Sequence, residues 1–167
     1  MAFTSLTTLA TWGKFLTMKP LLLILPLLLT CSLRGADTPK LLLAKVWKET
    51  IDPTGWWISE KYDGMRGFWD GKALWSRGGK PIHAPDYFLA ELPKDIALDG
   101  ELWLGRGKFE DTVSIVRRQT PDARWRQIQF MVFDAPKVKG TFEKRMVFLK
   151  TQLPATAKHV RPVPQWL

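Results

Sequence analysis

The sequence has 167 residues, which suits one domain, or one domain with a leader, and excludes a large multidomain assembly. Its hydrophobic fraction of 46% excludes a wholly disordered chain. With 25 Lys and Arg against 16 Asp and Glu, the formal net charge of +9 favours a polyanionic partner, which is a nucleic acid, a nucleotide or an acidic membrane surface.

The N-terminal part is typical of a secretory signal peptide. Met18 and a lysine precede the apolar run 21–29, and small polar residues follow it. The run is too short to span a membrane, so no stable membrane insertion is expected. We expect translation to start at Met18, cleavage after Ser32 or Ala36, and export to the periplasm. Lipidation of Cys31 is the alternative.

Without residues 1–36 the chain keeps 22 basic and 16 acidic residues, a net charge of +6, because that segment holds three basic and no acidic residues. It also loses its one cysteine. A disulfide and a cysteine metal site are therefore excluded, and His83 and His159 are too few for a histidine-rich one.

Short strands and helices alternate irregularly after the leader, which predicts an α+β fold. The first half is expected to be rich in strands and turns, with these elements: a strand over 55–62, a hairpin of 67–69 and 73–77 around Asp70-Gly71, a short helix from Pro85 to Leu92, and a second hairpin over 96–104 around Asp99-Gly100.

The second half is expected to hold a helix over 109–118, a strand over 128–133 and a helix over 141–153. Thr141 is the expected N-cap of the last helix. The sequence contains no internal repeat and no linker after the leader, so a single domain is predicted for 37–167.

Four local patterns carry chemistry. Lys61-Tyr62-Asp63-Gly64-Met65-Arg66 offers a nucleophile beside a cationic clamp, although a lysine amine attacks phosphorus only when it is neutral. Ser76-Arg77 closes the first hairpin. Asp99-Gly100-Glu101-Leu102 places Glu101 at the tip of the expected second hairpin, where it can hold a ribose hydroxyl or a divalent metal. Phe130–Asp134 ends a strand with Phe133, which can stack on a purine. Taken singly, each pattern also describes an ordinary turn or core strand.

The order of these four patterns resembles the covalent nucleotidyltransferases, which are ATP-dependent DNA ligases, RNA ligases and mRNA capping enzymes. The segments 105–111, 115–117 and 130–134, together with Trp125, are most similar to the small bacterial DNA ligases that carry a secretion signal. The resemblance covers about residues 41–153. It implies a ligase-type adenylation domain of antiparallel sheets with flanking helices, in a monomeric enzyme of DNA repair, replication or recombination.

The resemblance also implies a role for each site residue. Lys61 would attack the α-phosphate of ATP and become lysyl-AMP, which passes AMP to the 5′-phosphate of nicked double-stranded DNA before the 3′-hydroxyl seals the nick. Arg66 and Arg77 would contact the nucleotide or the nick phosphate. Glu101 would bind the ribose and help to place a divalent metal, expected to be magnesium. Phe133 would stack on adenine.

The family has further elements downstream, a Glu-Gly motif, a Lys-x-Lys strand and an OB-fold domain, and nothing after Phe133 matches them. Lys137-Val138-Lys139 has the letters of the second motif but reads as a solvated connector. Residues 37–167 are therefore expected to be the N-terminal part of an adenylation domain, truncated and without the OB-fold. The alternatives are an inactive nucleic-acid-binding module on the same scaffold and an RNA ligase.

Overall fold

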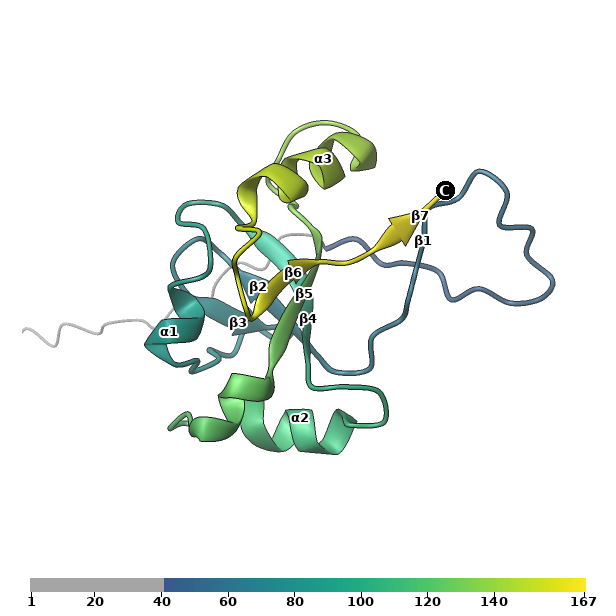
Figure 1. Ribbon diagram of the computed structural model, residues 1–167. Helices are drawn as coiled ribbons and strands as arrows, with labels where there is room; N and C mark the ends of the chain where they lie inside the picture. Colours follow the sequence, from purple (N-terminus) through teal and green to yellow (C-terminus); the bar gives the residue numbers. More distant parts are fainter. Residues whose placement is uncertain (1–40) are drawn as a thin grey trace, which may run out of the picture. The chain divides into compact units, whose positions relative to one another are not determined.

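The computed structural model describes residues 41–167 (Figure 1). The predicted signal peptide, its cleavage sites and Cys31 lie outside the described residues. Within 41–167, no helix has both the length and the apolar character that a membrane span requires.

A five-stranded sheet forms the centre of the fold, with the strand order β3-β2-β4-β5-β6. Its neighbours pair antiparallel except for β5 and β6, which are parallel. A separate two-stranded sheet pairs β1 with β7. The strands are β1 (Ile58–Ser59), β2 (Met65–Trp69), β3 (Leu74–Ser76), β4 (Leu98–Trp103), β5 (Gln129–Asp134), β6 (Val160–Pro162) and β7 (Gln165–Trp166).

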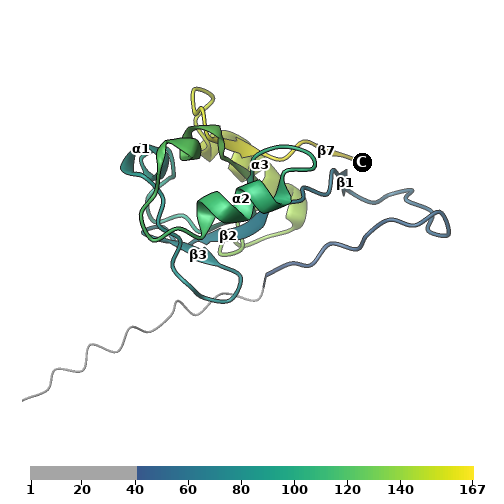
Figure 2. The same cartoon turned by 90° about the horizontal axis from the view of Figure 1, so that it is seen from below.

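Three α-helices and one 3-10 helix accompany the sheets (Figure 2). They are α1 (Asp86–Leu89), α2 (Phe109–Val116), η1 (Ala123–Gln127) and α3 (Phe142–Gln152). Helix α2 lies against β2 and β4, whereas α3 lies against β5. The mixture of antiparallel strands and a few helices confirms the predicted α+β class.

One face of the large sheet is apolar and the other is more polar. This is possible because successive side chains along a strand point to opposite faces. One face carries Leu98 and Leu102 of β4 and Phe130 of β5, which join the main core with Phe88 and Trp125. The rings of Phe88 and Trp125 meet edge to face with centroids 5.0 Å apart. The hydrophobic effect of burying these side chains fixes the sheet on its helices. The opposite face is left for polar groups.

Arg66, Phe68, Asp99 and Glu101 lie on that opposite face. The register of β2 and β4 places Arg66 across from Glu101 and Phe68 across from Asp99. Residues that lie directly opposite each other in an antiparallel pair project to the same side. The charged groups that the sequence analysis singled out on two separate segments are therefore brought together by strand pairing.

The first expected hairpin is confirmed, with its loop shifted by one residue. Asp70 donates its N–H to the carbonyl of Ala73, so the two loop residues are Gly71 and Lys72. The Asp70 carboxylate accepts from the backbone N–H of Lys72 and of Ala73. Helices α2 and α3 and strand β5 are also confirmed within two residues at each end. Thr141 occupies the N-cap position of α3 without a side-chain cap hydrogen bond.

Two predictions about strands are wrong. The expected strand over 55–62 is reduced to Ile58–Ser59, because only these residues find a partner, in β7. The expected hairpin at Asp99-Gly100 does not exist, since both residues lie inside the continuous central strand β4. Glu101 is therefore in mid-strand and not at a hairpin tip.

The Asp-Gly pair in β4 is explained by its neighbours. Asp99 is fully buried against Arg66, so its carboxylate is used for an ion pair and not for a turn. Gly100 is required because a Cβ atom there would lie 2.5 Å from the carbonyl oxygen of Met131 and 3.0 Å from the Cα of Val132. Both obstacles are backbone atoms of β5, which cannot move aside without breaking the pairing.

Gly100→Ala is therefore expected to lower the free energy of unfolding by about 2 to 3 kcal/mol, as overpacking between two paired strands does. Urea denaturation measures this change. The matched control is Gly78→Ala, where a Cβ would meet no atom within 4 Å, and its effect should stay within about 0.5 kcal/mol. Equal stability of the two variants would contradict the proposed close approach of β4 and β5.

Candidate active site

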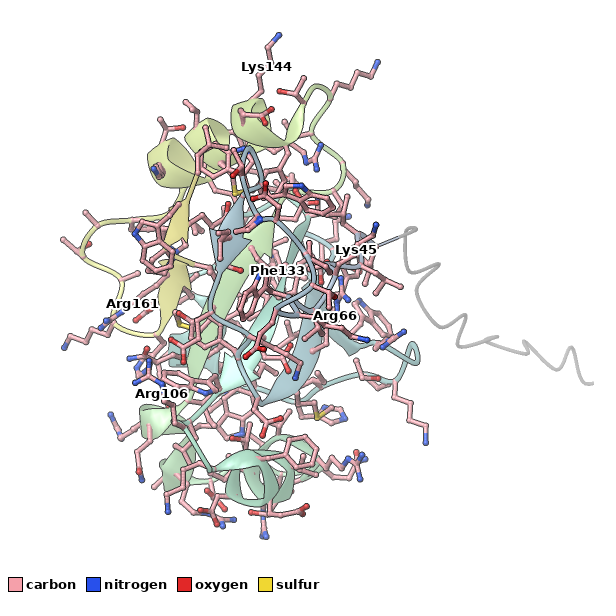
Figure 3. All side chains as sticks on the ribbon, turned by 90° about the vertical axis from the view of Figure 1, so that its right-hand side faces the viewer. Lys45, Arg66, Arg106, Phe133, Lys144 and Arg161 are labelled. Atoms are coloured by element: carbon pink, nitrogen blue, oxygen red, sulfur yellow. The ribbon has the colours of Figure 1, made fainter. Side chains whose placement is uncertain are left out.

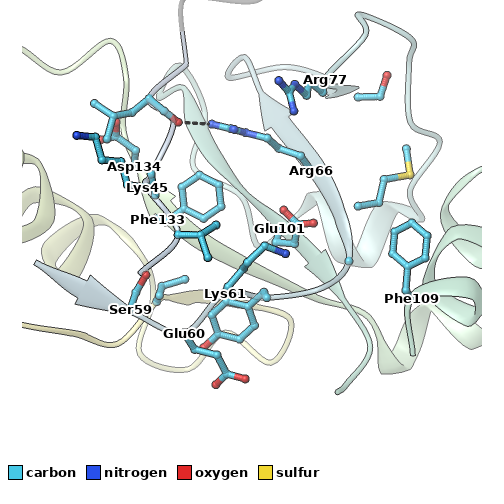
Figure 4. A pocket seen from close by; sticks show the side chains of 18 of the residues that line it. Lys45, Ser59, Glu60, Lys61, Arg66, Arg77, Glu101, Phe109, Phe133 and Asp134 are labelled. Atoms are coloured by element: carbon cyan, nitrogen blue, oxygen red, sulfur yellow. Dashed lines mark hydrogen bonds between the residues drawn. The ribbon is translucent and has the colours of Figure 1, made fainter. Parts of the chain in front are cut away.

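The polar face of the sheet bears a pocket of about 1500 Å³. In Figure 3, Arg66 and Phe133 lie side by side near the middle of this face. All five residues that the sequence analysis proposed for nucleotide binding line this pocket, and they come from four separate segments: Lys61, Arg66, Arg77, Glu101 and Phe133 (Figure 4). The structure thus brings the candidate site residues together, whereas their roles stay predictions.

Lys61 is held by contacts on both sides of it. Before it, Ser59 pairs with Gln165 of β7. After it, the ring of Tyr62 packs edge to face on Trp103 of β4, with centroids 5.1 Å apart. The chain then passes so close to β4 that a Cβ atom at Gly64 would collide with the carbonyl of Leu102. This close approach explains the glycine of the Lys-x-Asp-Gly pattern and fixes the backbone that carries Lys61.

Arg66 lies on the floor of the pocket and has three partners, one of which is the Leu42 carbonyl oxygen, to which Nη2 donates at 2.9 Å (Figure 4). Its Nε and Nη2 atoms donate to the two carboxylate oxygens of Asp99, at 2.9 and 2.5 Å. Its guanidinium also lies over the ring of Phe133, with its central carbon 5.2 Å from the centroid. The hydrogen bonds that Arg66 donates to the Asp99 carboxylate raise the pKa of the guanidinium above its usual range, so the group stays charged. One face of Phe133 is therefore covered, and a purine can stack only on the other.

A β-bulge directs Phe133 into the pocket. Strand β5 pairs Asp134 with Asp99 and Val132 with Gly100, so Phe133 is the extra residue on the bulged strand. Both Phe133 and Asp134 line the pocket as a result. Asp134 is almost fully buried and accepts from Arg145 of α3 at 2.6 Å and from the N–H of Ala135 at 2.8 Å. This pair ties helix α3 to the edge of the site.

Glu101 carries the least compensated carboxylate of the pocket. Burial raises its pKa to about 7, despite the opposing effects of the Gly64 N–H, Arg66 and Lys61. Its neighbour Asp99 is paired with Arg66, which lies opposite Glu101 in β2. Figure 4 shows the Lys61 and Glu101 side chains directed toward each other. Such a carboxylate gains free energy from any cation that enters the pocket.

The carboxylates of this face suit magnesium only if substrate phosphates and water complete its coordination. Residues 41–167 contain no cluster of three or more His, Cys, Asp or Glu side chains arranged to hold a metal ion. Magnesium, however, is commonly bound through one or two carboxylates together with water and substrate phosphates. Glu101 suits that mode because its carboxylate is poorly compensated, whereas Asp99 and Asp134 are engaged by arginines.

Arg77 lies across the pocket from Lys61, in the turn after β3. The turn is closed by the Ser76 hydroxyl, which accepts from the N–H of Lys80 at 3.0 Å. The Arg77 side chain is exposed and lines the pocket (Figure 4). Phe109 at the start of α2 forms an apolar wall on the same side. The pocket therefore has a cationic rim at one end and aromatic walls at two others.

Other basic side chains lie in the pocket or beside the residues that line it. In Figure 3, Lys45 lies close to Arg66, whereas Arg106 lies toward the lower edge and Lys144 projects outward from α3 at the top. Lys45 lines the pocket itself, and its ammonium lies 5.4 Å from the ring centroid of Trp56. Arg106 makes a bidentate pair with Glu60, next to Lys61. Because this pair is exposed, it contributes little to stability.

Three features around the pocket are not apparent from the sequence: the ion pair of Asp99, the ion pair of Arg145, and the short strands β6 and β7. Asp-Gly is a strong hairpin signal and predicts a turn at Asp99, although the apolar arms on both sides equally suit a central strand. Arg145 stands on a helix face with no local pattern that links it to Asp134. Strands β6 and β7 have two or three residues each and contain prolines or flank them, so no periodicity reveals them.

Comparison with known proteins identifies the relatives of this chain. No protein-family model matches the sequence. A curated protein of Haemophilus influenzae named DNA ligase is 39% identical over 99 residues, which are 59% of this chain and 36% of that protein. A solved structure described as a structure-function analysis of Lig E DNA ligases, which bind DNA with a minimal scaffold, is 40% identical, with a TM-score of 0.67 over 75% of this chain and 50% of that one.

Two other solved structures, named Pmar-Lig_Pre and Pmar-Lig_PreS3, share the fold at 22% and 23% identity. Their TM-scores are 0.52 and 0.51, and each match covers 66% of this chain and 30% of the other. The sequence identity and the shared fold show that this chain is homologous to part of a DNA ligase, as the four ordered patterns predicted. The chain spans about a third of the length of the curated relative it matches.

The raised pKa of Glu101 predicts a pH-dependent stability. The pKa is about 7 in the folded protein against an ordinary value of 4.5, so folding favours the protonated carboxyl. The wild type should therefore lose stability as the pH rises through this interval, whereas Glu101→Gln should not. At about pH 8 and without divalent metal, Glu101→Gln is expected to be more stable by about 2 kcal/mol, and at about pH 4 the two should be equal.

Urea denaturation at a series of pH values measures this difference. Glu49→Gln is the matched control because its side chain is exposed, and it should track the wild type at every pH. A constant difference between wild type and Glu101→Gln would show that burial does not govern the titration of Glu101.

Proposed function

We propose that this chain carries the nucleotidyl-transfer site of an ATP-dependent DNA ligase. The observation that carries the proposal is the meeting of Lys61, Arg66, Arg77, Glu101 and Phe133 in one pocket, although they are spread over more than seventy residues of sequence. The homology to a curated DNA ligase supports the same reaction class. The substrates are ATP and a nicked duplex with a 5′-phosphate and a 3′-hydroxyl.

The first step forms a phosphoramidate on Lys61. The neutral Nζ atom attacks the α-phosphorus of ATP, a nitrogen–phosphorus bond forms, and the bond from that phosphorus to the bridging oxygen breaks. Pyrophosphate leaves with the bonding electron pair, and the amine nitrogen releases its proton. The charge that develops on the phosphate oxygens requires cationic partners more than a strong base.

Different pocket residues would bind the phosphates and the base. Arg66 is preorganised, because Asp99 holds two of its N–H groups and Phe133 supports its plane. Its Nη1 group remains to meet a phosphate oxygen. Arg77, on the exposed rim, suits the more distant phosphates or the phosphate of the nick. The uncovered face of Phe133 receives the adenine ring.

Magnesium would be held by Glu101 together with phosphate oxygens and water. It would supply positive charge at the phosphates and improve the leaving pyrophosphate. Binding can be followed without turnover, since added Mg²⁺ should raise the melting temperature of the wild type above about pH 7 and leave Glu101→Gln unchanged. An equal rise in both proteins would place the metal elsewhere.

The AMP group then passes to the 5′-phosphate of a nick, and the 3′-hydroxyl displaces it to seal the strand. The excess of basic residues suits contact with the DNA backbone. Export to the periplasm, expected from the predicted leader, belongs to this proposal. A role in DNA repair, replication or recombination follows from the reaction and belongs to it as well.

The direct test of the first step is incubation of the chain with α-³²P-labelled ATP and Mg²⁺, followed by denaturing electrophoresis. The wild type is expected to carry a covalent, acid-labile label, and Lys61→Ala to lose it by more than a hundredfold. Lys137→Ala is the matched control, because Lys137 is exposed in the turn before α3 and does not line the pocket. It should label like the wild type.

A wild type without label contradicts nucleotidyl transfer by this chain. If such a protein still bound nicked DNA, with an affinity that falls as salt is added and does not change in Lys61→Ala, it would be a nucleic-acid-binding module. Sealing of nicked RNA in preference to nicked DNA would instead identify an RNA ligase.

A further inference from the structure

An exposed ion pair joins the residue before Lys61 to the turn that follows β4. Arg106 donates from Nε and Nη2 to the two carboxylate oxygens of Glu60, at 2.7 and 2.8 Å. A pair this exposed adds little to the stability of the fold, because water and salt screen its charges. Its two parallel hydrogen bonds nevertheless fix the direction of both side chains. The pair therefore suits a positional role better than a stabilising one.

The turn that carries Arg106 attaches it closely to the central sheet. The N–H of Lys108 donates to the carbonyl of Gly105 at 3.3 Å, which closes a four-residue turn around Arg106. Gly107 has a φ of 69°, in the left-handed region that glycine adopts without strain. The turn joins the end of β4 directly to the start of α2. Arg106 is therefore anchored to the sheet that forms the floor of the pocket.

Lys61, in contrast, lies in a segment that belongs to no strand. Strand β1 ends at Ser59 and strand β2 begins at Met65, so residues 60–64 connect the two without pairing of their own. A nucleophile must be held in line with the bond that it breaks, and a small displacement lowers the rate steeply. The backbone that carries Lys61 must therefore be held by side-chain contacts.

The residues on either side of Lys61 provide these contacts. Glu60 pairs with Arg106, and the ring of Tyr62 packs edge to face on Trp103. Both partners belong to the end of β4 or to the turn after it. In Figure 4, the side chains of Glu60 and Lys61 point to opposite sides of the chain. Two neighbouring side chains thus hold the segment against one edge of the sheet while Lys61 faces the pocket.

We propose that Arg106 is a positioning residue for nucleotidyl transfer, which fixes Glu60 and thereby directs Lys61 at the α-phosphorus. The proposal rests on the proposed function, because it concerns the same reaction. Glu60 lines the pocket and Arg106 does not, so Arg106 acts through Glu60 and makes no contact with ATP. Loss of the pair should therefore slow the transfer to Lys61 without weakening the binding of the nucleotide.

The test measures the rate of labelling by α-³²P-labelled ATP and Mg²⁺ over a range of ATP concentrations. Arg106→Gln is expected to lower the maximal rate by about tenfold and to leave the ATP concentration at half-maximal rate unchanged within about twofold. Glu60→Gln should have the same effect. The double variant should be no slower than either single variant, because all three lack the same contact.

Arg124→Gln is the matched control. Arg124 also forms an exposed ion pair, with Asp122 at 2.7 Å, and it does not line the pocket. This variant should label at the wild-type rate. The melting temperatures of all variants should stay within about 4 °C of the wild type, because exposed pairs contribute little. A slower reaction in Arg106→Gln then reflects the position of Lys61 and not a loss of folded protein.

The outcomes separate this proposal from the previous one. If the wild type is labelled and Arg106→Gln reaches the same maximal rate, the role of Arg106 is overturned and the proposed function stands. A higher ATP requirement at an unchanged maximal rate would overturn it too, since Arg106 would then contact the nucleotide. A double variant in which the two losses multiply would show that Arg106 acts independently of Glu60. A wild type without label would overturn both proposals.

Discussion

The buried pair of Arg66 and Asp99 is the interaction on which the site depends. A carboxylate that is fully buried in the central strand is tolerated only because a guanidinium meets both of its oxygens. The pair in turn fixes the plane of Arg66 above Phe133. Arg66 belongs to β2, Asp99 to β4 and Phe133 to β5. The register of these three strands therefore also sets the shape of the pocket floor.

The division of the sheet into an apolar and a polar face explains how a small scaffold can support charged chemistry. The apolar face of β4 and β5 buries its side chains in the main core. The polar face then concentrates Arg66, Asp99 and Glu101 with little water, and the cost appears at Glu101, whose pKa rises to about 7. A ligand that brings a cation into the pocket would offset this cost, and the metal-nucleotide complex of the proposed function is such a ligand.

The sequence predicted much of the fold, and it predicted five candidate residues that the structure places in one pocket, for physical reasons that can be named. Helix α2 and strand β5 are predicted from the spacing of their apolar residues. The pattern of Lys61, Asp63, Gly64 and Arg66 suits a nucleophile beside a cationic clamp for phosphate. Local patterns misplaced Asp99-Gly100, since the reason for that glycine is a backbone thirty residues away in β5. Strand β7 gave no signal at all, because it is two residues long and forms only by pairing with β1.

The β-bulge in β5 makes the site unusually sensitive to a change of chain length. Phe133 is one residue more than the pairing with β4 needs. Deletion of this single residue would leave Val132 and Asp134 opposite their present partners and restore a regular ladder. The sheet would survive, and Asp134 would still reach Arg145, but the pocket would lose the ring that supports Arg66. In this strand, the candidate stacking residue occupies the one position that pairing with β4 does not need.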